Sequence, residues 1–286
     1  MGIALGLGAA LSWGVADYFA AIASRRIGTL RVVLGFHVVA MVLLGVLVLA
    51  TDGLAHLHAS DLPLFVGLGA IGWLSYLTFY AALAIGPISV LSPIVSGYAA
   101  VTVLLAVLID GESLNALEAL AVVMTIAGVM VSSADIGQLR SVSMERRQAL
   151  GLVLAVAAMA LLGGFVFGVA DRHATLGWLA PIFLARGFAT VFVFGQGARE
   201  GLRWPEWTPR LGAIVVLLGV VDTTGYICFN IGSEHAPTSI VAAASAPYAL
   251  IPVAAGVLLL GERPGLLQRT GVVLVIGGLI VLGLAQ

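Results

Sequence analysis

Charged positions interrupt the hydrophobic pattern of the 286-residue chain only at short breaks, with long apolar stretches between them. Residues 62–109 contain no Asp, Glu, Lys or Arg, which leaves room for two membrane crossings of about 20 residues each. Helices are the expected element because an open strand in lipid leaves backbone groups unpaired. The pattern predicts ten helices, near residues 3–23, 32–51, 62–85, 88–109, 114–134, 149–169, 178–197, 211–232, 238–260 and 266–285.

The second half of the chain repeats the pattern of the first. Residues 76–131 and 226–281 align without a gap. Matched pairs include Tyr76/Tyr226, Phe79/Phe229, Pro87/Pro237, Ser89/Ser239, Tyr98/Tyr248, Gly111/Gly261, Glu112/Glu262 and Gly128/Gly278. Five crossings per copy is an odd number, so the second copy enters the membrane upside down. The sequence predicts an all-α membrane protein of ten transmembrane helices in two inverted five-helix repeats, residues 1–135 and 148–286, with a connecting loop at 136–147.

Composition supports the membrane class. Hydrophobic residues make up 61% of the chain and charged residues 9%, and the mean hydropathy is +1.13. Soluble proteins carry about 25% charged residues, so these values exclude an ordinary soluble domain. The net charge of −1, without a basic tract, gives nucleic acid no site. Cys228 is the single cysteine, which excludes a disulfide framework.

The arginines are unevenly distributed between the two membrane faces. The chain has no lysine, and Arg172 lies at one face while most other arginines lie at the opposite face. Those at the arginine-rich face are Arg25, Arg26, Arg31, Arg140, Arg146, Arg147, Arg199, Arg203, Arg210, Arg263 and Arg269. Cytoplasmic loops carry an excess of Lys and Arg. We therefore expect this face to be cytoplasmic and both termini to lie outside.

The doubled motif resembles that of the drug/metabolite transporter superfamily, in particular its ten-helix members with two EamA-type repeats. The matching residues are the Tyr…Phe…Pro-x-Ser…Gly-Glu pattern of both halves and Trp13-Gly14 in the first helix. The sixth helix departs from it, with Leu162-Gly163 at the equivalent place. The resemblance covers essentially the whole chain. It implies a transporter of an undefined small solute in the cytoplasmic (inner) membrane of a prokaryote.

Four ionisable residues fall inside predicted helices, where a charge is costly: Asp17, His37, Arg186 and Asp222. At a rise of about 1.5 Å per residue, Asp17 and His37 both lie roughly 8–9 Å from the arginine-rich face. A carboxylate beside an imidazole is a candidate proton-handling pair. The structural alternative is that His37 packs near the interface and Asp17 lies at a helix kink.

The same estimate places Arg186 and Asp222 near the membrane centre on neighbouring helices. Opposite charges at one depth predict either a buried ion pair or two groups that face a central cavity. A purely structural pair and contact with a substrate both remain open.

The predicted eighth helix carries a polar stripe. Asp222, Tyr226 and Asn230 follow one another at i, i+4 and i+8, a spacing that keeps side chains near one helix face. A stripe of this kind at the membrane centre indicates the lining of a site for a polar ligand.

The third helix has an aromatic counterpart at the repeat-equivalent positions, Gly72, Tyr76 and Tyr80, with Trp73 beside them. Aromatic faces attract cations by about 0.5–2 kcal/mol per contact. The two helices together predict a ligand with a polar or charged head and a flat or apolar body. Helix packing, or an aromatic belt at the membrane interface, is the alternative for Trp73 and Tyr76.

The fourth and ninth predicted helices carry tyrosines and prolines. Tyr98 and Tyr248 occupy matched positions and either line the site or bond neighbouring helices. Pro93, Pro247 and Pro252 lie inside these helices, where each removes a backbone hydrogen bond and favours a kink. The Gly-Glu pairs that follow both helices, Gly111-Glu112 and Gly261-Glu262, are interpreted as helix caps.

The chain contains no Gly-x-Ser-x-Gly, no His-Glu-x-x-His and no phosphate-binding loop, so enzymatic functions are not favoured. His56 and His58 with nearby acidic residues are interpreted as solvated loop residues, so no catalytic residue, metal or cofactor is expected. The sequence predicts a secondary transporter that moves a small organic metabolite or drug-like solute by alternating access, with proton coupling, transport direction and oligomeric state open. The expected partners are that solute and membrane lipids.

A lipid flippase or scramblase, and a membrane sensor or assembly subunit that does not transport, are the alternative functions. Asp17 and His37 are the proton-coupling candidates. The candidate substrate-binding residues are Trp13, Asp17, Trp73, Tyr76, Tyr80, Tyr98, Arg186, Asp222, Tyr226, Asn230 and Tyr248.

Overall fold

The computed structural model covers the chain and describes residues 1–86, 88–133, 146–203, 208–251 and 265–285. In these ranges every regular element is a helix, nine segments cross from one face of the molecule to the other, and a tenth begins at Thr238. The chain is therefore a multi-pass, all-α membrane protein, as the apolar pattern predicted. The unbroken crossings are α1 (Gly2–Ile27), α2 (Thr29–Thr51), α3 (Leu62–Ile85), α6 (Ala116–Ser133), α8 (Arg146–Ala170), α10 (Leu179–Arg199), α11 (Pro209–Ser233) and α14 (Leu266–Leu284).

Two crossings are broken near their middle. The fourth consists of α4 (Ile88–Ser96) and α5 (Tyr98–Leu108), which meet at Gly97. The ninth begins with α12 (Thr238–Ser245) and continues as the 3-10 turn η2 (Ala246–Ala249), which contains Pro247. These interruptions fall in the two segments, near 88–109 and 238–260, in which the prolines favoured a kink. Pro252 and the pair Gly261-Glu262 lie outside the described residues.

Helix ends follow local sequence signals. The Thr208 side chain accepts a hydrogen bond from the backbone N–H of Leu211 at 3.2 Å, and Pro209 begins α11. Asn115 and Glu118 form reciprocal bonds at the start of α6: the Asn115 Oδ1 accepts from the N–H of Glu118 at 3.0 Å, and the Glu118 carboxylate accepts from the N–H of Asn115 at 2.8 Å. Two short elements that the apolar pattern did not predict, η1 (Ala59–Asp61) and α9 (His173–Leu176), lie in the connections.

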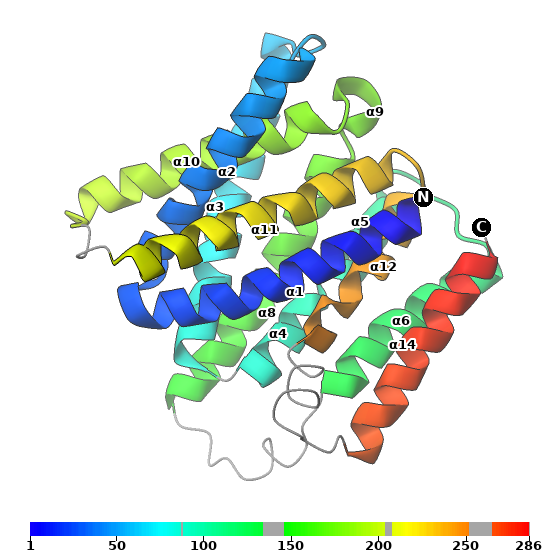
Figure 1. Cartoon of the computed structure of the whole chain (residues 1–286). Helices are drawn as coiled ribbons and strands as arrows, with labels where there is room; N and C mark the ends of the chain where they lie inside the picture. The colour runs from blue at the N-terminus through cyan, green and yellow to red at the C-terminus, as the bar shows by residue number, and fades with distance from the viewer. Residues whose placement is uncertain (87, 134–145, 204–207, 252–264, 286) are drawn as a thin grey trace.

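The two repeats pack reciprocally. The first helix of each repeat packs against the third helix of the other, so α1 lies beside α11 and α8 beside α3 (Figure 1). The second helices α2 and α10 contact each other, and so do the last helices α6 and α14. This exchange of partners is the arrangement expected of two inverted repeats around a shared centre.

The contact between α6 and α14 depends on the repeat-equivalent glycines Gly128 and Gly278. A Cβ atom on Gly128 would lie 2.7 Å from the backbone nitrogen of Val275. A Cβ atom on Gly278 would lie 2.8 Å from the backbone nitrogen of Thr125. Small residues allow such backbone approach, which drives helix association in lipid.

The crossings define two faces of the molecule. The face that carries the ends of α1 and α10, with Arg25, Arg26 and Arg199, is called the arginine-rich face. There Arg25 donates from Nη2 to the carbonyl of Gly86 at 2.8 Å and so satisfies the end of α3. The opposite, arginine-poor face holds both chain termini, which lie on the same side in Figure 1. An even number of crossings produces this placement.

Candidate functional site

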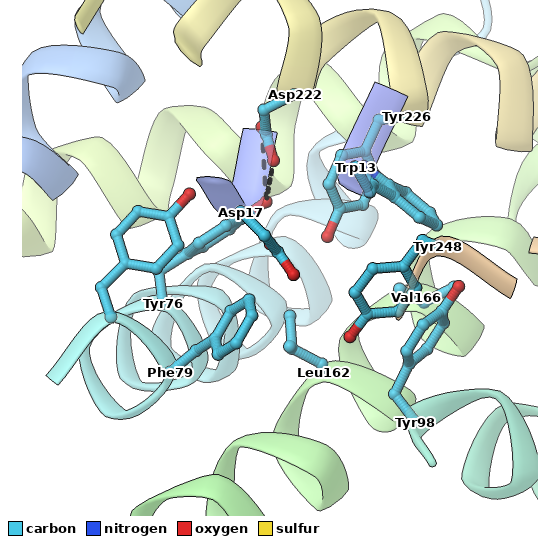
Figure 2. A pocket seen from close by; sticks show the side chains of 11 residues that line it. Trp13, Asp17, Tyr76, Phe79, Tyr98, Leu162, Val166, Asp222, Tyr226 and Tyr248 are labelled. Carbon is cyan, nitrogen blue, oxygen red and sulfur yellow. Dashed lines mark hydrogen bonds between the residues drawn. The ribbon is translucent and has the colours of Figure 1, made fainter. Parts of the chain in front are cut away.

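A central cavity of about 40 Å³ lies where helices of both repeats meet. It is lined from α1, α3, α5, α8, α11 and η2 (Figure 2). The lining consists of Trp13, Asp17, Tyr76, Phe79, Tyr80, Tyr98, Leu162, Val166, Asp222, Tyr226 and Tyr248. Seven of these side chains are aromatic, so the walls are mostly flat and apolar, with two carboxylates among them.

The carboxylate of Asp17 points into the space between Phe79, Leu162 and Tyr248 (Figure 2). One of its oxygens, Oδ2, accepts a hydrogen bond from the Ser92 hydroxyl at 3.0 Å. Asp17 is only 4% exposed. A carboxylate buried to this degree needs a partner, and a hydroxyl satisfies it less well than a cation does.

Asp222 lies on α11, which packs against α1, and is neutralised by Arg186 of α10, with which it forms a buried ion pair. Tyr76 bridges the two groups: its Oη accepts a hydrogen bond from Arg186 Nη2 at 2.6 Å and donates to Asp222 Oδ1 at 3.2 Å. The guanidinium carbon of Arg186 lies 4.4 Å from the centroid of the Tyr226 ring. Aromatic rings therefore cover a charge that has no access to water.

The broken crossings contact each other at the cavity wall. The hydroxyl of Tyr98, at the start of α5, lies 2.6 Å from the hydroxyl of Ser245 at the end of α12. The hydroxyl of Tyr248 donates to the carbonyl of Ser92 in α4 at 3.5 Å. Each repeat thus sends one tyrosine into the broken crossing of the other.

Most of the residues predicted to bind substrate meet at this cavity. They are Trp13, Asp17, Tyr76, Tyr80, Tyr98, Asp222, Tyr226 and Tyr248. Three others lie outside its lining. Arg186 lies behind Asp222; Asn230 donates from Nδ2 to the carbonyl of Tyr226 at 2.8 Å; and Trp73 donates from Nε1 to Oε1 of Gln196 at 2.9 Å.

The structure places His37 and Asp17 in different surroundings. Nδ1 of His37 lies 2.8 Å from the carbonyl of Val33, and the imidazole meets the Tyr76 ring edge-on at 5.3 Å between centroids. Asp17 is bonded instead to Ser92. Both residues lie in the described part of the chain, and no hydrogen bond joins them. Tyr76, which lines the cavity, packs against the imidazole of His37.

Sequence reasoning missed the apolar part of the lining, namely Phe79, Leu162 and Val166. A signal existed for two of them. Phe79 belongs to the repeated Tyr-x-x-Phe pattern, and Leu162 occupies the place that Trp13 holds in the first repeat. Val166 follows Leu162 by one helical turn, so it lines the same face of α8.

The cavity combines an aromatic lining with the carboxylate of Asp17, groups that attract a cation and pack against a flat ring. Within the described ranges no three His, Cys, Asp or Glu side chains gather closely enough to hold a metal. The one carboxylate without a basic partner, Asp17, faces rings that favour positive charge at their faces.

Comparison with known proteins agrees with this architecture. The model of the EamA-like transporter family matches residues 1–134 and 149–284. No curated protein matches the chain. Among solved structures, 29 chains match, and one crystal structure shares 17% identity over 99% of this chain and 96% of that one, with a TM-score of 0.74. That likeness shows the fold, and the family match spans both repeats: the chain belongs to the EamA-like transporter family and is a membrane transporter of the drug/metabolite type.

Proposed function

We propose that the chain moves a small organic cation or zwitterion with a flat apolar body through the central cavity by alternating access. The observation that carries this proposal is the unequal treatment of the two carboxylates in the cavity. Asp222 has a fixed cationic partner in Arg186, whereas Asp17 is bonded to the hydroxyl of Ser92.

Charge determines the chemistry of the ligand. The Arg186–Asp222 pair contributes no net charge, so an ionised Asp17 leaves the cavity with one negative charge. Because the membrane interior penalises an uncompensated charge, a cationic group that contacts Asp17 gains more there than in water. An anionic solute would meet repulsion from the same carboxylate.

Shape and size determine the rest of the ligand. Trp13 lies edge-on to Tyr226 with 4.9 Å between ring centroids, and Tyr98 and Tyr248 lie 6.0 Å apart. Such rings pack against a flat body and attract an amine by about 0.5–2 kcal/mol per contact. In this conformation the cavity measures about 40 Å³, so a metabolite with one or two rings fits only when rocking of the repeats widens it.

Alternating access is supported by the arrangement of the repeats. Discontinuous helices from two inverted repeats meet at the centre, which is where transporters of this architecture bind substrate. Rocking of one repeat against the other opens the cavity to each face in turn. Tyr98 and Tyr248 lie where the two repeats separate.

Proton exchange at Asp17 follows from the same geometry. A proton and a cationic solute both neutralise one carboxylate, so they compete for it, and release of one accompanies binding of the other. His37 lies behind Tyr76 and acts through that residue rather than on Asp17 directly. We therefore expect flux of a cation against an opposing proton gradient.

Three phenols that differ only in their side-chain head test the proposal: tyramine (cationic), tyrosol (neutral) and 4-hydroxyphenylacetate (anionic). The assays are thermal stabilisation of the purified protein and flux into proteoliposomes under an imposed pH gradient. We expect tyramine to stabilise and to cross, tyrosol to bind at least about tenfold more weakly, and the anion to do neither. This tenfold corresponds to loss of one charge-assisted contact of about 1.4 kcal/mol.

The variant Asp17→Asn isolates the carboxylate, and Asp52→Asn at the arginine-poor face is its matched control. Asp17→Asn should remove the preference for tyramine over tyrosol and the response to the pH gradient. Equal behaviour of the three phenols, or unchanged selectivity in Asp17→Asn, would refute a cation site at Asp17. Stabilisation by tyramine without flux would favour a sensor over a transporter.

A further inference from the structure

A hydrogen-bonded contact made by Glu112 joins the two repeats at the arginine-poor face. The carboxylate of Glu112, in the connection between α5 and α6, accepts from the backbone N–H of Thr238 at 2.7 Å and of Ser239 at 3.1 Å. Both N–H groups belong to the first turn of α12, which carries the positive end of the helix dipole. The sequence pattern had suggested that Glu112 caps the next helix of its own repeat; it caps a helix of the other repeat.

The backbone around Glu112 is fixed in place. Gly111 has a φ of +68°, a left-handed conformation that favours glycine. The N–H of Glu112 donates to the carbonyl of Ala106 in α5 at 3.1 Å. The glutamate is therefore a rigid extension of α5 that reaches across to α12.

The helix that Glu112 holds separates the cavity from the arginine-poor face. α12 runs from Thr238 at that face to Ser245, which contacts Tyr98 at the cavity wall. Its residues from Thr238 to Ser245 are at most 2% exposed. α12 packs against α1 and α5, so the route from the cavity to this face is filled along about 10 Å of helix.

We propose that Glu112 is a positioning residue that latches α12 to α5 and holds the arginine-poor end of the cavity closed. The proposal rests on the alternating access described above. α5 and α12 come from different repeats and are bonded at both ends, by Tyr98 and Ser245 at the cavity and by Glu112 with Thr238 and Ser239 at the surface. Rocking that opens this end separates the two helices, so the latch breaks in the conformation open to the arginine-poor face.

The strength of the two hydrogen bonds in the latch depends on the negative charge of Glu112. Two hydrogen bonds from a helix N-terminus to a carboxylate are charge-assisted, and loss of the charge weakens both. The variant Glu112→Gln keeps the size and one acceptor oxygen but removes the charge. We expect it to shift the balance between the two conformations about fivefold to tenfold toward the one open at the arginine-poor face.

Access to a cysteine in the cavity measures this balance without a known substrate. Val166→Cys, in a background of Cys228→Ala, places a single thiol in the lining. An impermeant methanethiosulfonate reagent is applied to intact cells and to inverted vesicles, and His235→Cys identifies which preparation exposes the arginine-poor face. We expect Glu112→Gln to raise the labelling rate from that face about fivefold to tenfold and to lower the rate from the arginine-rich face.

Glu118→Gln is the matched control. Glu118 also accepts from a backbone N–H at a helix start on the arginine-poor face, but its partner Asn115 belongs to the same helix end. We expect it to leave both rates as in the parent. In the double variant Glu112→Cys with Thr238→Cys, a short bifunctional reagent can join the two thiols through disulfide bonds. This crosslink should hold the arginine-poor end closed, and a reductant that cleaves it should restore access.

The changes in the labelling rates from the two faces distinguish a latch, which shifts them in opposite directions, from a general packing effect, which shifts them together. If Glu112→Gln raises labelling from both faces, or from neither, and crosslinking at Thr238 leaves access unchanged, the latch is refuted. Access of Val166→Cys from only one face in all variants would refute alternating access itself, which is the failure of the proposed function. The two outcomes are therefore separate.

Discussion

At the scale of single residues, the difference between Asp17 and Asp222 organises the site. Both carboxylates lie in the cavity wall and both residues are 4% exposed. Arg186 and Tyr76 both donate hydrogen bonds to the carboxylate of Asp222, whereas the carboxylate of Asp17 points into the cavity (Figure 2). We therefore infer that Asp222 has a structural role and that Asp17 is available to a ligand.

Removal of one member of the Arg186–Asp222 pair should destabilise the protein more than removal of both. Asp222→Asn leaves a buried guanidinium without its anion, at a cost of about 3–5 kcal/mol. The double variant Asp222→Asn with Arg186→Gln removes both charges and should recover a large part of that loss. Thermal unfolding in detergent measures it, and a double variant less stable than Asp222→Asn alone would contradict the account.

Depth and type of residue were predictable from the sequence, but the direction of some side chains was not. Counting residues from the helix ends placed Arg186 and Asp222 at one depth, and the structure pairs them. Asn230 lies outside the cavity lining because each step of four residues along a helix rotates the side chain by about 40°. Two steps therefore turn it by about 80° from Asp222. Trp73 turns toward Gln196 of α10, and nothing in a single apolar helix indicates which neighbour it meets.

Among the helices, the interruptions at Gly97 and after Ser245 place Tyr98 and Tyr248 at the cavity. Pro93 and Pro247 indicated a kink in these helices, and Pro247 lies in the 3-10 turn that follows α12. The sequence did not show where the fourth crossing is interrupted, because the residues on both sides of Gly97 are equally apolar.

Close packing of α6 on α14 predicts a large effect of a small substitution. Gly128→Ala would place a methyl group 2.7 Å from a backbone nitrogen of α14, which should cost about 1–3 kcal/mol through overpacking. Gly67→Ala in α3 is the matched control, since no atom lies within 4 Å of its Cβ position, and its better helix propensity should keep or raise stability. Equal melting temperatures for both variants would argue against this interface.

At the scale of the whole molecule, the fold was almost fully predictable. The apolar pattern gave ten crossings, the 76–131 and 226–281 repeat gave two copies, and an odd number of helices per copy gave their inversion. The sequence could not show that the repeats exchange helices, because α1 beside α11 and α8 beside α3 are contacts between distant segments. The cross-repeat cap at Glu112 follows from that exchange and was missed for the same reason.

The contact between repeats at the arginine-poor face should make stability depend on pH. Partial burial, a hydrogen bond to the Asp171 carboxyl and the negative charges of Asp171 and Glu112 raise the pKa of Asp110 from 3.8 to about 7, against an opposing effect of Arg172. Because the folded protein holds the proton more tightly than the unfolded chain, this contribution is fully present below pH 3.8 and is lost as the pH rises through about 7.

Melting temperatures between pH 5 and 8.5 measure that dependence. The parent protein should lose stability across pH 7, and Asp110→Asn should flatten the profile because it cannot ionise. Asp52→Asn, an exposed position at the same face, is the control and should keep the parent profile. A parent profile that rises with pH through this range would be inconsistent with a shared proton between Asp110 and Asp171.

We propose that one cavity, which opens alternately to both faces, selects cations through Asp17. The most direct measurement compares a cationic with an anionic impermeant methanethiosulfonate reagent on the single thiol of Val166→Cys with Cys228→Ala, from each face in turn. Rates are divided by those of a surface thiol, His235→Cys, to remove intrinsic reactivity.

The account predicts reaction from both faces, with the cationic reagent faster by at least about tenfold, which corresponds to about 1.4 kcal/mol. Asp17→Asn should bring that ratio close to one without loss of access. Reaction from a single face, or a charge preference that survives Asp17→Asn, would contradict the claim.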